Sequence, residues 1–125
     1  MRPTCIWLSL VWILFDVAGC SKSNSQIEPP GWNAKINRGK TLVRVYGCQT
    51  CHEIPTVADA RGFVGPSLGG VATKYYLAGE LPNSPENLRR WIQSPHSINP
   101  RTVMPDMNVT DADAADIATF LETLK

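Results

Sequence analysis

The sequence lacks a surplus of either charge and has no concentrated run of basic side chains. Its 125 residues carry 12 Lys and Arg against 11 Asp and Glu, a formal net charge of +1. We therefore expect no nucleic-acid partner. Internal repeats are also missing, as are alternating apolar and polar runs long enough for a β-sheet. These absences favour one small domain built mainly of helices.

A long apolar run is missing too. The run over residues 5–15 is of signal-peptide length and falls short of the roughly 20 residues that span a bilayer. It follows Arg2 and leads into Val17-Ala18-Gly19-Cys20, which resembles a bacterial lipobox cleaved just before its cysteine. We expect a lipoprotein signal peptide over residues 1–19 and a lipid on Cys20. The protein would then be exported and lipid-anchored to a bacterial membrane, facing the periplasm or the cell exterior.

The alternative is an ordinary signal peptide cut at or near Gly19, which leaves Cys20 as a free thiol. An exposed thiol is a liability in an oxidising compartment, which favours lipidation. Cysteine is scarce, with four in the chain. Cys5 leaves with the signal peptide and Cys20 takes the lipid, so Cys48 and Cys51 remain. Because these two belong to another motif, we expect no disulfide.

That motif is Cys48-Gln49-Thr50-Cys51-His52, a C-x-x-C-H run typical of covalent c-type haem. Residues i and i+3 of a helical turn share a face, so both thiols can reach one porphyrin edge and add to its vinyl groups. His52 then turns its imidazole toward the iron as the proximal ligand. We expect one covalent haem c with its iron as the cofactor.

Three other interpretations of this run are a thioredoxin-type redox pair, half of a zinc site, and chance. A redox pair needs no histidine directly after it and belongs in a βαβ context. A zinc site needs two more ligands, and His96 is the one candidate left in the mature region.

The rest of the chain divides into a tether over residues 20–36, polar and rich in turn formers, and a domain over residues 37–125. Apolar spacing predicts three helices. One runs over residues 40–46, one starts at the cap Ser84 and ends at Pro95, and one runs from the cap Thr110 to the C-terminus. The long loops over residues 55–76 and 94–108 would wrap the haem.

A methionine sulfur is the expected sixth iron ligand, since a soft, neutral thioether favours ferrous iron. The mature region holds two methionines, Met104 and Met107. Both can equally serve in core packing, the commoner use of methionine. Pro105 forces an extended backbone on Met104 and stiffens the loop that presents it, so we expect Met104 rather than Met107. His96 is the outside candidate and is expected as an exposed loop histidine.

Taken together, these motifs resemble the bacterial class I monohaem cytochromes c over residues 39–124. The resemblance rests on Tyr46-Gly47 before the haem motif, Gly65-Pro66-Ser67-Leu68, Tyr75-Tyr76-Leu77-Ala78-Gly79, residues 82–88, Trp91-Ile92, Met104-Pro105 and Phe120-Leu121. It implies a small all-α cytochrome c fold, with three to five helices wrapped around one covalent haem. The first and last helices would cross, bringing Gly39, Val43 or Tyr46 against Ile117, Phe120 or Leu121.

The resemblance also implies roles for single residues. Pro66 would offer its carbonyl to His52 from behind, and Met104 would supply the distal sulfur. Tyr76 and Trp91 would cover or hydrogen-bond the haem propionates, although ordinary buried aromatics are the alternative. Phe120 stands where tyrosine is more usual, which should affect packing alone.

The function implied is a membrane-tethered electron carrier with a low-spin His/Met haem, not an enzyme. A respiratory chain would be its setting, with a terminal oxidase or a periplasmic dehydrogenase as partner. One alternative is a haem-containing subunit of a larger oxidase or dehydrogenase complex. Others are a haem-based sensor or ligand-binding module and a peroxidase-like enzyme, and the Met104-Pro105 loop argues against both.

Overall fold

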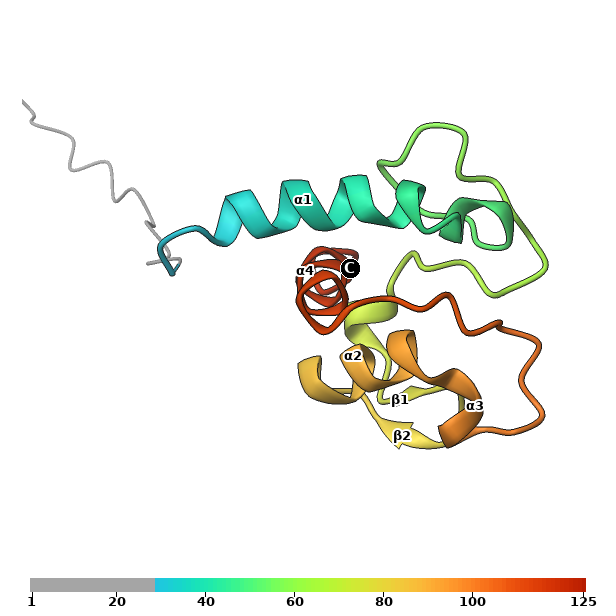
Figure 1. The fold of residues 1–125 in the computed structure, drawn as a ribbon. Helices are drawn as coiled ribbons and strands as arrows, with labels where there is room; N and C mark the ends of the chain where they lie inside the picture. The colour runs from blue at the N-terminus through green and yellow to red at the C-terminus, as the bar shows by residue number, and fades with distance from the viewer. Residues whose placement is uncertain (1–28) are drawn as a thin grey trace, which may run out of the picture.

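The computed structural model describes residues 29–125, so the expected signal peptide, Cys20 and most of the tether lie outside the described residues. The described chain contains α1 (Trp32–Val45), α2 (Pro85–Gln93), α3 (Pro95–Ile98) and α4 (Asp111–Leu121), as Figure 1 shows. Two short 3-10 turns, η1 (Cys48–Thr50) and η2 (Val71–Thr73), lie between α1 and α2. The predicted all-α class is confirmed. None of the described helices is long and apolar enough to cross a membrane.

Helix α1 begins earlier than the apolar spacing predicted. The prediction started at Lys40, but the helix starts at Trp32 after Gly31, which has a positive φ of 82°. Residues 32–36, expected as the end of the tether, therefore belong to α1. Two of these five residues, Asn33 and Lys35, are polar, and Ile36 packs against the core from this first part of the helix.

Helices α1 and α4 cross closely, as the family resemblance implied (Figure 1). A Cβ built on Gly39 would lie 2.1 Å from the backbone oxygen of Asp116 and 2.8 Å from the Cβ of Phe120. The helices can approach this far because Gly39 has no side chain. Val43 on α1 and Phe120 on α4 are buried at the crossing.

Capping residues fix where α2 and α4 begin, as predicted. The Ser84 hydroxyl accepts a hydrogen bond from the Asn87 amide at 3.2 Å, and Pro85 occupies the first turn of α2. The Thr110 hydroxyl accepts one from the Asp113 amide, also at 3.2 Å. Helix α4 ends at Leu121 and does not reach the C-terminus.

Two features of the long loops were not predicted. Strands β1 (Tyr76–Leu77) and β2 (Leu81–Pro82) pair antiparallel, with Leu77 opposite Leu81. With two residues each, they are too short to show an alternating pattern. Pro95 was expected to stop a helix, but it opens the short helix α3, which also contains His96. Proline suits both places, because its fixed φ fits a first helical turn.

Candidate functional site

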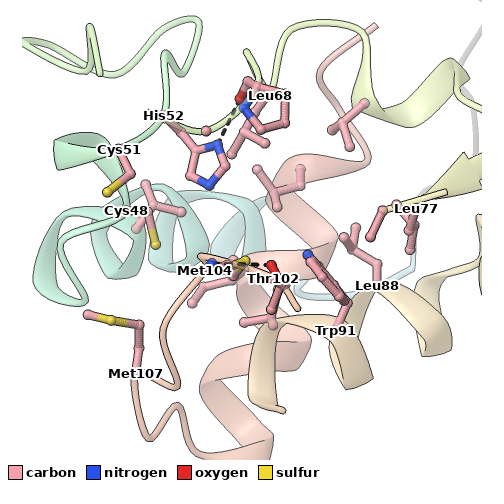
Figure 2. A pocket seen from close by; sticks show the side chains of 18 of the residues that line it. Cys48, Cys51, His52, Leu68, Leu77, Leu88, Trp91, Thr102, Met104 and Met107 are labelled. Atoms are coloured by element: carbon pink, nitrogen blue, oxygen red, sulfur yellow. Dashed lines mark hydrogen bonds between the residues drawn. The ribbon is translucent and has the colours of Figure 1, made fainter. Parts of the chain in front are cut away.

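A cavity of about 540 Å³ opens between the haem-motif segment, α2 and the loop that precedes α4 (Figure 2). Its volume is within the range of pockets that hold a cofactor. The lining is mostly apolar, with contributions from the core side chains of α1, α2 and α4. The hydrophobic core and the cavity are thus continuous, so a ligand here would complete the core.

The C-x-x-C-H segment forms one wall of this pocket. Gly47, with φ 73°, turns the chain out of α1 into η1. The amide of His52 then donates to the carbonyl of Cys48 at 3.0 Å. This turn brings the thiols of Cys48 and Cys51 to the pocket, where Figure 2 shows them along with His52.

The burial of the Cys48 thiol argues against a thioredoxin-type redox pair. Both cysteines are half-buried. Burial raises the pKa of the Cys48 thiol, whereas a reactive redox cysteine needs a lowered pKa. A zinc site finds no support either, because no group of three Cys, His, Asp or Glu side chains converges within residues 29–125.

His52 is held in one orientation by the backbone that follows it. Its Nδ1 lies 2.7 Å from the carbonyl oxygen of Pro66, the contact that the family resemblance implied. A carbonyl only accepts, so Nδ1 donates, and Nε2 keeps its lone pair for a metal. Gly65 lies flat against the ring, since a Cβ there would come within 2.4 Å of the His52 Cε1. Sequence reasoning had not assigned this packing role to Gly65.

Met104 and Met107 both line the pocket, on the loop before α4. In Figure 2, His52 and Met104 project into the pocket from opposite sides, while Met107 stands apart on the same loop. The Met104 amide donates to the Thr102 hydroxyl at 3.2 Å, which fixes the backbone that carries the sulfur. Met107 is 37% exposed.

His96 is not among the residues that line the pocket. It lies on α3 with Nδ1 3.6 Å from a carboxylate oxygen of Asp106. The structure thus places the outside candidate for iron ligation away from the predicted site.

The cytochrome c family model matches residues 36–125. The chain belongs to the cytochrome c family. Its cofactor is haem c, covalently bound and with iron, and its function is electron transfer. The cavity fits that group, since an apolar pocket with two adjacent thiols, an oriented imidazole and a thioether offers the donor set of a c-type haem.

Two relatives are cytochromes c-552. The one from Nitrosomonas europaea is 33% identical over 92 residues, covering 67% of this chain and 76% of that protein. The one from Hydrogenobacter thermophilus is 30% identical over 92 residues, covering 67% of this chain and 79% of that protein. These matches support a class I cytochrome c.

A third relative is cytochrome c oxidase subunit 2 of Alkalihalophilus pseudofirmus. It is 30% identical over 105 residues, which cover 82% of this chain. The chain spans only 29% of that subunit's length. No solved structure matches the chain.

The rim of this cytochrome c pocket holds the remaining predicted residues. Trp91 on α2 is half-buried with its indole facing the pocket, and Tyr76 on β1 is 61% exposed at the edge. Lys74, which the sequence reasoning missed, is the one lysine, arginine or carboxylate side chain in the described lining.

Proposed function

We propose that this protein is a membrane-tethered electron carrier whose haem is low-spin, with His52 and Met104 as the residues that would hold its iron. The observation that carries the proposal is the convergence of these two side chains, with Cys48 and Cys51, on one apolar pocket. The cysteines would hold the haem as thioethers, and His52 Nε2 and the Met104 sulfur would hold its iron. When bound, the haem supplies a one-electron change between ferric and ferrous iron.

The protein's own groups would set how that electron change occurs. Pro66 fixes the His52 tautomer through the 2.7 Å contact at Nδ1. Apolar walls exclude water, which limits the solvent rearrangement that follows a change of charge. With both axial positions taken by side chains, no substrate would reach the metal, which separates this function from a peroxidase or a gas sensor.

Met104 is the better sixth ligand of the two methionines. It faces His52 across the pocket, and its backbone is fixed by Thr102 on one side and Pro105 on the other. At the rim, the polar groups of Tyr76 and Trp91 and the ammonium of Lys74 suit the haem carboxylates. The lysine would partly neutralise those carboxylates and favour ferrous iron.

The location in the cell is proposed from the N-terminal sequence. The apolar run of residues 5–15 and the lipobox-like Val17-Ala18-Gly19-Cys20 support export and lipid attachment at Cys20. The domain would then face the periplasm or the cell exterior, within a respiratory chain. Its redox partner would be a terminal oxidase or a periplasmic dehydrogenase.

Likeness to a subunit named cytochrome c oxidase subunit 2 favours a second candidate function. The protein would then be a haem-containing subunit of a larger oxidase or dehydrogenase complex. Gentle detergent extraction followed by size separation tests this directly. A haem signal that runs with a large complex supports the subunit, and one that runs alone supports the mobile carrier.

The ligand set is tested with paired methionine variants. Met104→Ala should remove the weak red absorption of ferric iron that marks thioether ligation, lower the midpoint potential and open the iron to carbon monoxide. Met107→Ala is the matched control and should keep the band. Loss of the band in Met107→Ala alone would reverse the assignment, and its survival in both variants would refute methionine ligation.

Haem attachment and anchoring are tested separately. Replacing Cys48 and Cys51 with alanine should abolish haem staining on a denaturing gel, and unchanged staining would refute their role. Cys20→Ser should move the haem-stained protein from the membrane fraction to the soluble fraction. Continued sedimentation with membranes would show that another feature holds it there.

A further inference from the structure

A network of charged and polar side chains joins α1 to α4 beside the haem pocket. The Arg38 guanidinium, on α1, is paired with the carboxylates of both Asp113 and Asp116, on α4. The hydroxyl of Tyr46 donates a hydrogen bond to Asp113 at 2.7 Å. Thr110 adds a further contact by accepting from the amide of Asp113. The side chains of Arg38, Tyr46, Asp113 and Asp116 thus form one connected group from both ends of the domain.

Tyr46 connects this network to the cofactor site. It directly follows Val45, the last residue of α1, and precedes Cys48 by two positions. The residue also lines the pocket, while its hydroxyl lies on the Asp113 side. Tyr46 therefore joins the pocket wall to a carboxylate.

The network has an excess of negative charge on the side that is shielded from water. It contains two carboxylates and one guanidinium, a formal sum of −1. The Asp113 and Asp116 side chains are only 15% and 13% exposed, whereas Arg38 is 51% exposed. Water screens the arginine more than the carboxylates, so the negative charge acts more strongly at the pocket. The hydrogen bond from Tyr46 lowers the pKa of Asp113, so this carboxylate stays ionised to a lower pH than an ordinary aspartate.

We infer that Tyr46, Asp113, Asp116 and Arg38 form an electrostatic unit that sets the reduction potential of the haem from behind the pocket wall. The inference rests on the haem occupying the pocket, as proposed above. Ferric haem carries one more positive charge than ferrous haem, so nearby negative charge stabilises the ferric form. The two carboxylates would lower the potential, and Arg38 would partly offset them. None of these residues is among the proposed iron ligands, so they would act through their charge and position.

The test is a set of charge-changing variants of the haem-loaded protein, read out by midpoint potential. Asp113→Asn keeps the size of the side chain and an acceptor for Tyr46 but removes a negative charge, so it should raise the potential. Arg38→Gln removes the positive charge and should lower it. The shift of Asp113→Asn should be the larger, because Asp113 is less exposed than Arg38. Asp116→Asn should also raise the potential and serves if another variant fails to fold.

Opposite signs are the decisive feature, because a merely structural role would not produce them. A variant that only loosened the fold would admit water to the haem and shift the potential the same way in each case. Tyr46→Phe provides that comparison, since it keeps every charge and removes only the hydroxyl. It should lower the thermal midpoint while moving the potential less than Asp113→Asn does.

Matched controls are available at a second ion pair, which joins α2 to α4. Arg89 lies 3.5 Å from Asp111, which is 73% exposed and does not line the pocket. Arg89→Gln and Asp111→Asn make the same charge changes and should shift the potential less than the network variants do. Equal shifts at both pairs, or shifts of one sign in Arg38→Gln and Asp113→Asn, would overturn the inference. A wild-type protein without the His/Met spectrum would instead show that the proposed function has failed.

Discussion

The α1–α4 crossing and the haem pocket lie side by side in this cytochrome c but are built differently. The crossing is closed by protein atoms, with Gly39 against the α4 backbone and Phe120 buried beside it. The pocket keeps a cavity of about 540 Å³, and Val103 on its rim is 82% exposed. The comparison shows that the chain completes one half of its core by itself, while the other half is shaped for the haem.

Breaking the crossing should have the largest effect on stability. Gly39→Ala places a Cβ 2.1 Å from the Asp116 carbonyl, so the helices must separate. We expect the free energy of unfolding to fall by roughly 3 kcal/mol, as for severe overpacking, measured by denaturant titration of the haem-loaded protein. Gly31→Ala is the control, because its Cβ would meet nothing within 4 Å and only its positive φ is strained. A loss at Gly39 no larger than at Gly31 would contradict the close crossing.

A similar substitution on the pocket side should be felt first in the haem spectrum. Gly65→Ala would put a Cβ 2.4 Å from the His52 ring, which must tilt or move. We expect a loss of about 2 kcal/mol in unfolding free energy and a change in the low-spin absorption, because the imidazole shifts from its place. Gly69→Ala should leave the spectrum intact, because the new Cβ would lie 3.2 Å from its nearest neighbour, a side-chain carbon of Pro55, and would not meet His52. An unchanged spectrum in Gly65→Ala would argue against His52 as ligand.

Removing the α4 cap should cost less unfolding free energy than the Gly39 substitution does. Thr110→Ala deletes the hydroxyl that accepts from the Asp113 amide at 3.2 Å. The unfolding free energy should fall by about 1 kcal/mol, the usual cost of losing such a cap. Thr110→Ser keeps the hydroxyl and should recover most of the loss. A full loss in the serine variant would show that the methyl group, not the cap, matters.

Acid should weaken the crossing by a small amount. The pKa of Asp113 is lowered in the folded protein, chiefly by the Tyr46 hydrogen bond. A lowered pKa adds stability that is present above the ordinary aspartate pKa of about 3.9 and is lost as the pH falls below it. Asp113→Asn should therefore flatten the fall in thermal midpoint between about pH 5 and pH 3. The Asp111→Asn control should keep the wild-type slope, and equal slopes in all three proteins would refute the role of Asp113.

The parts of the fold and of the site that depend on neighbouring residues could be predicted from the sequence. Ser84 and Thr110 predicted the starts of α2 and α4, because a capping residue bonds to an amide only three residues further along the chain. The C-x-x-C-H run predicted the cofactor for the same reason, because the two cysteines and the histidine that would hold the haem lie close together in the sequence. Contacts that depended on distant residues, such as Pro66 with His52, came from the family resemblance.

The features that were missed depend on tertiary packing or lie below the length at which a pattern shows. The first part of α1 was assigned to the tether, and Ile36 holds it to the core by packing against residues that are distant in the sequence. Strands of two residues have no alternation to detect. The pairing of Arg38 with Asp113 and Asp116 joins residues more than 70 positions apart, as their separations of 75 and 78 show. Isolated charges of this kind look like ordinary surface residues in a sequence.

The long span of that pairing also affects the order in which the molecule matures. Synthesis delivers α1 well before its partner α4. Until then α1 cannot dock, because the loop that joins the two helices must close first. Cys48 and Cys51 lie inside that unclosed loop and stay accessible throughout the interval. The haem can thus be attached while the chain is still open, and α1 and α4 can pack against each other afterwards.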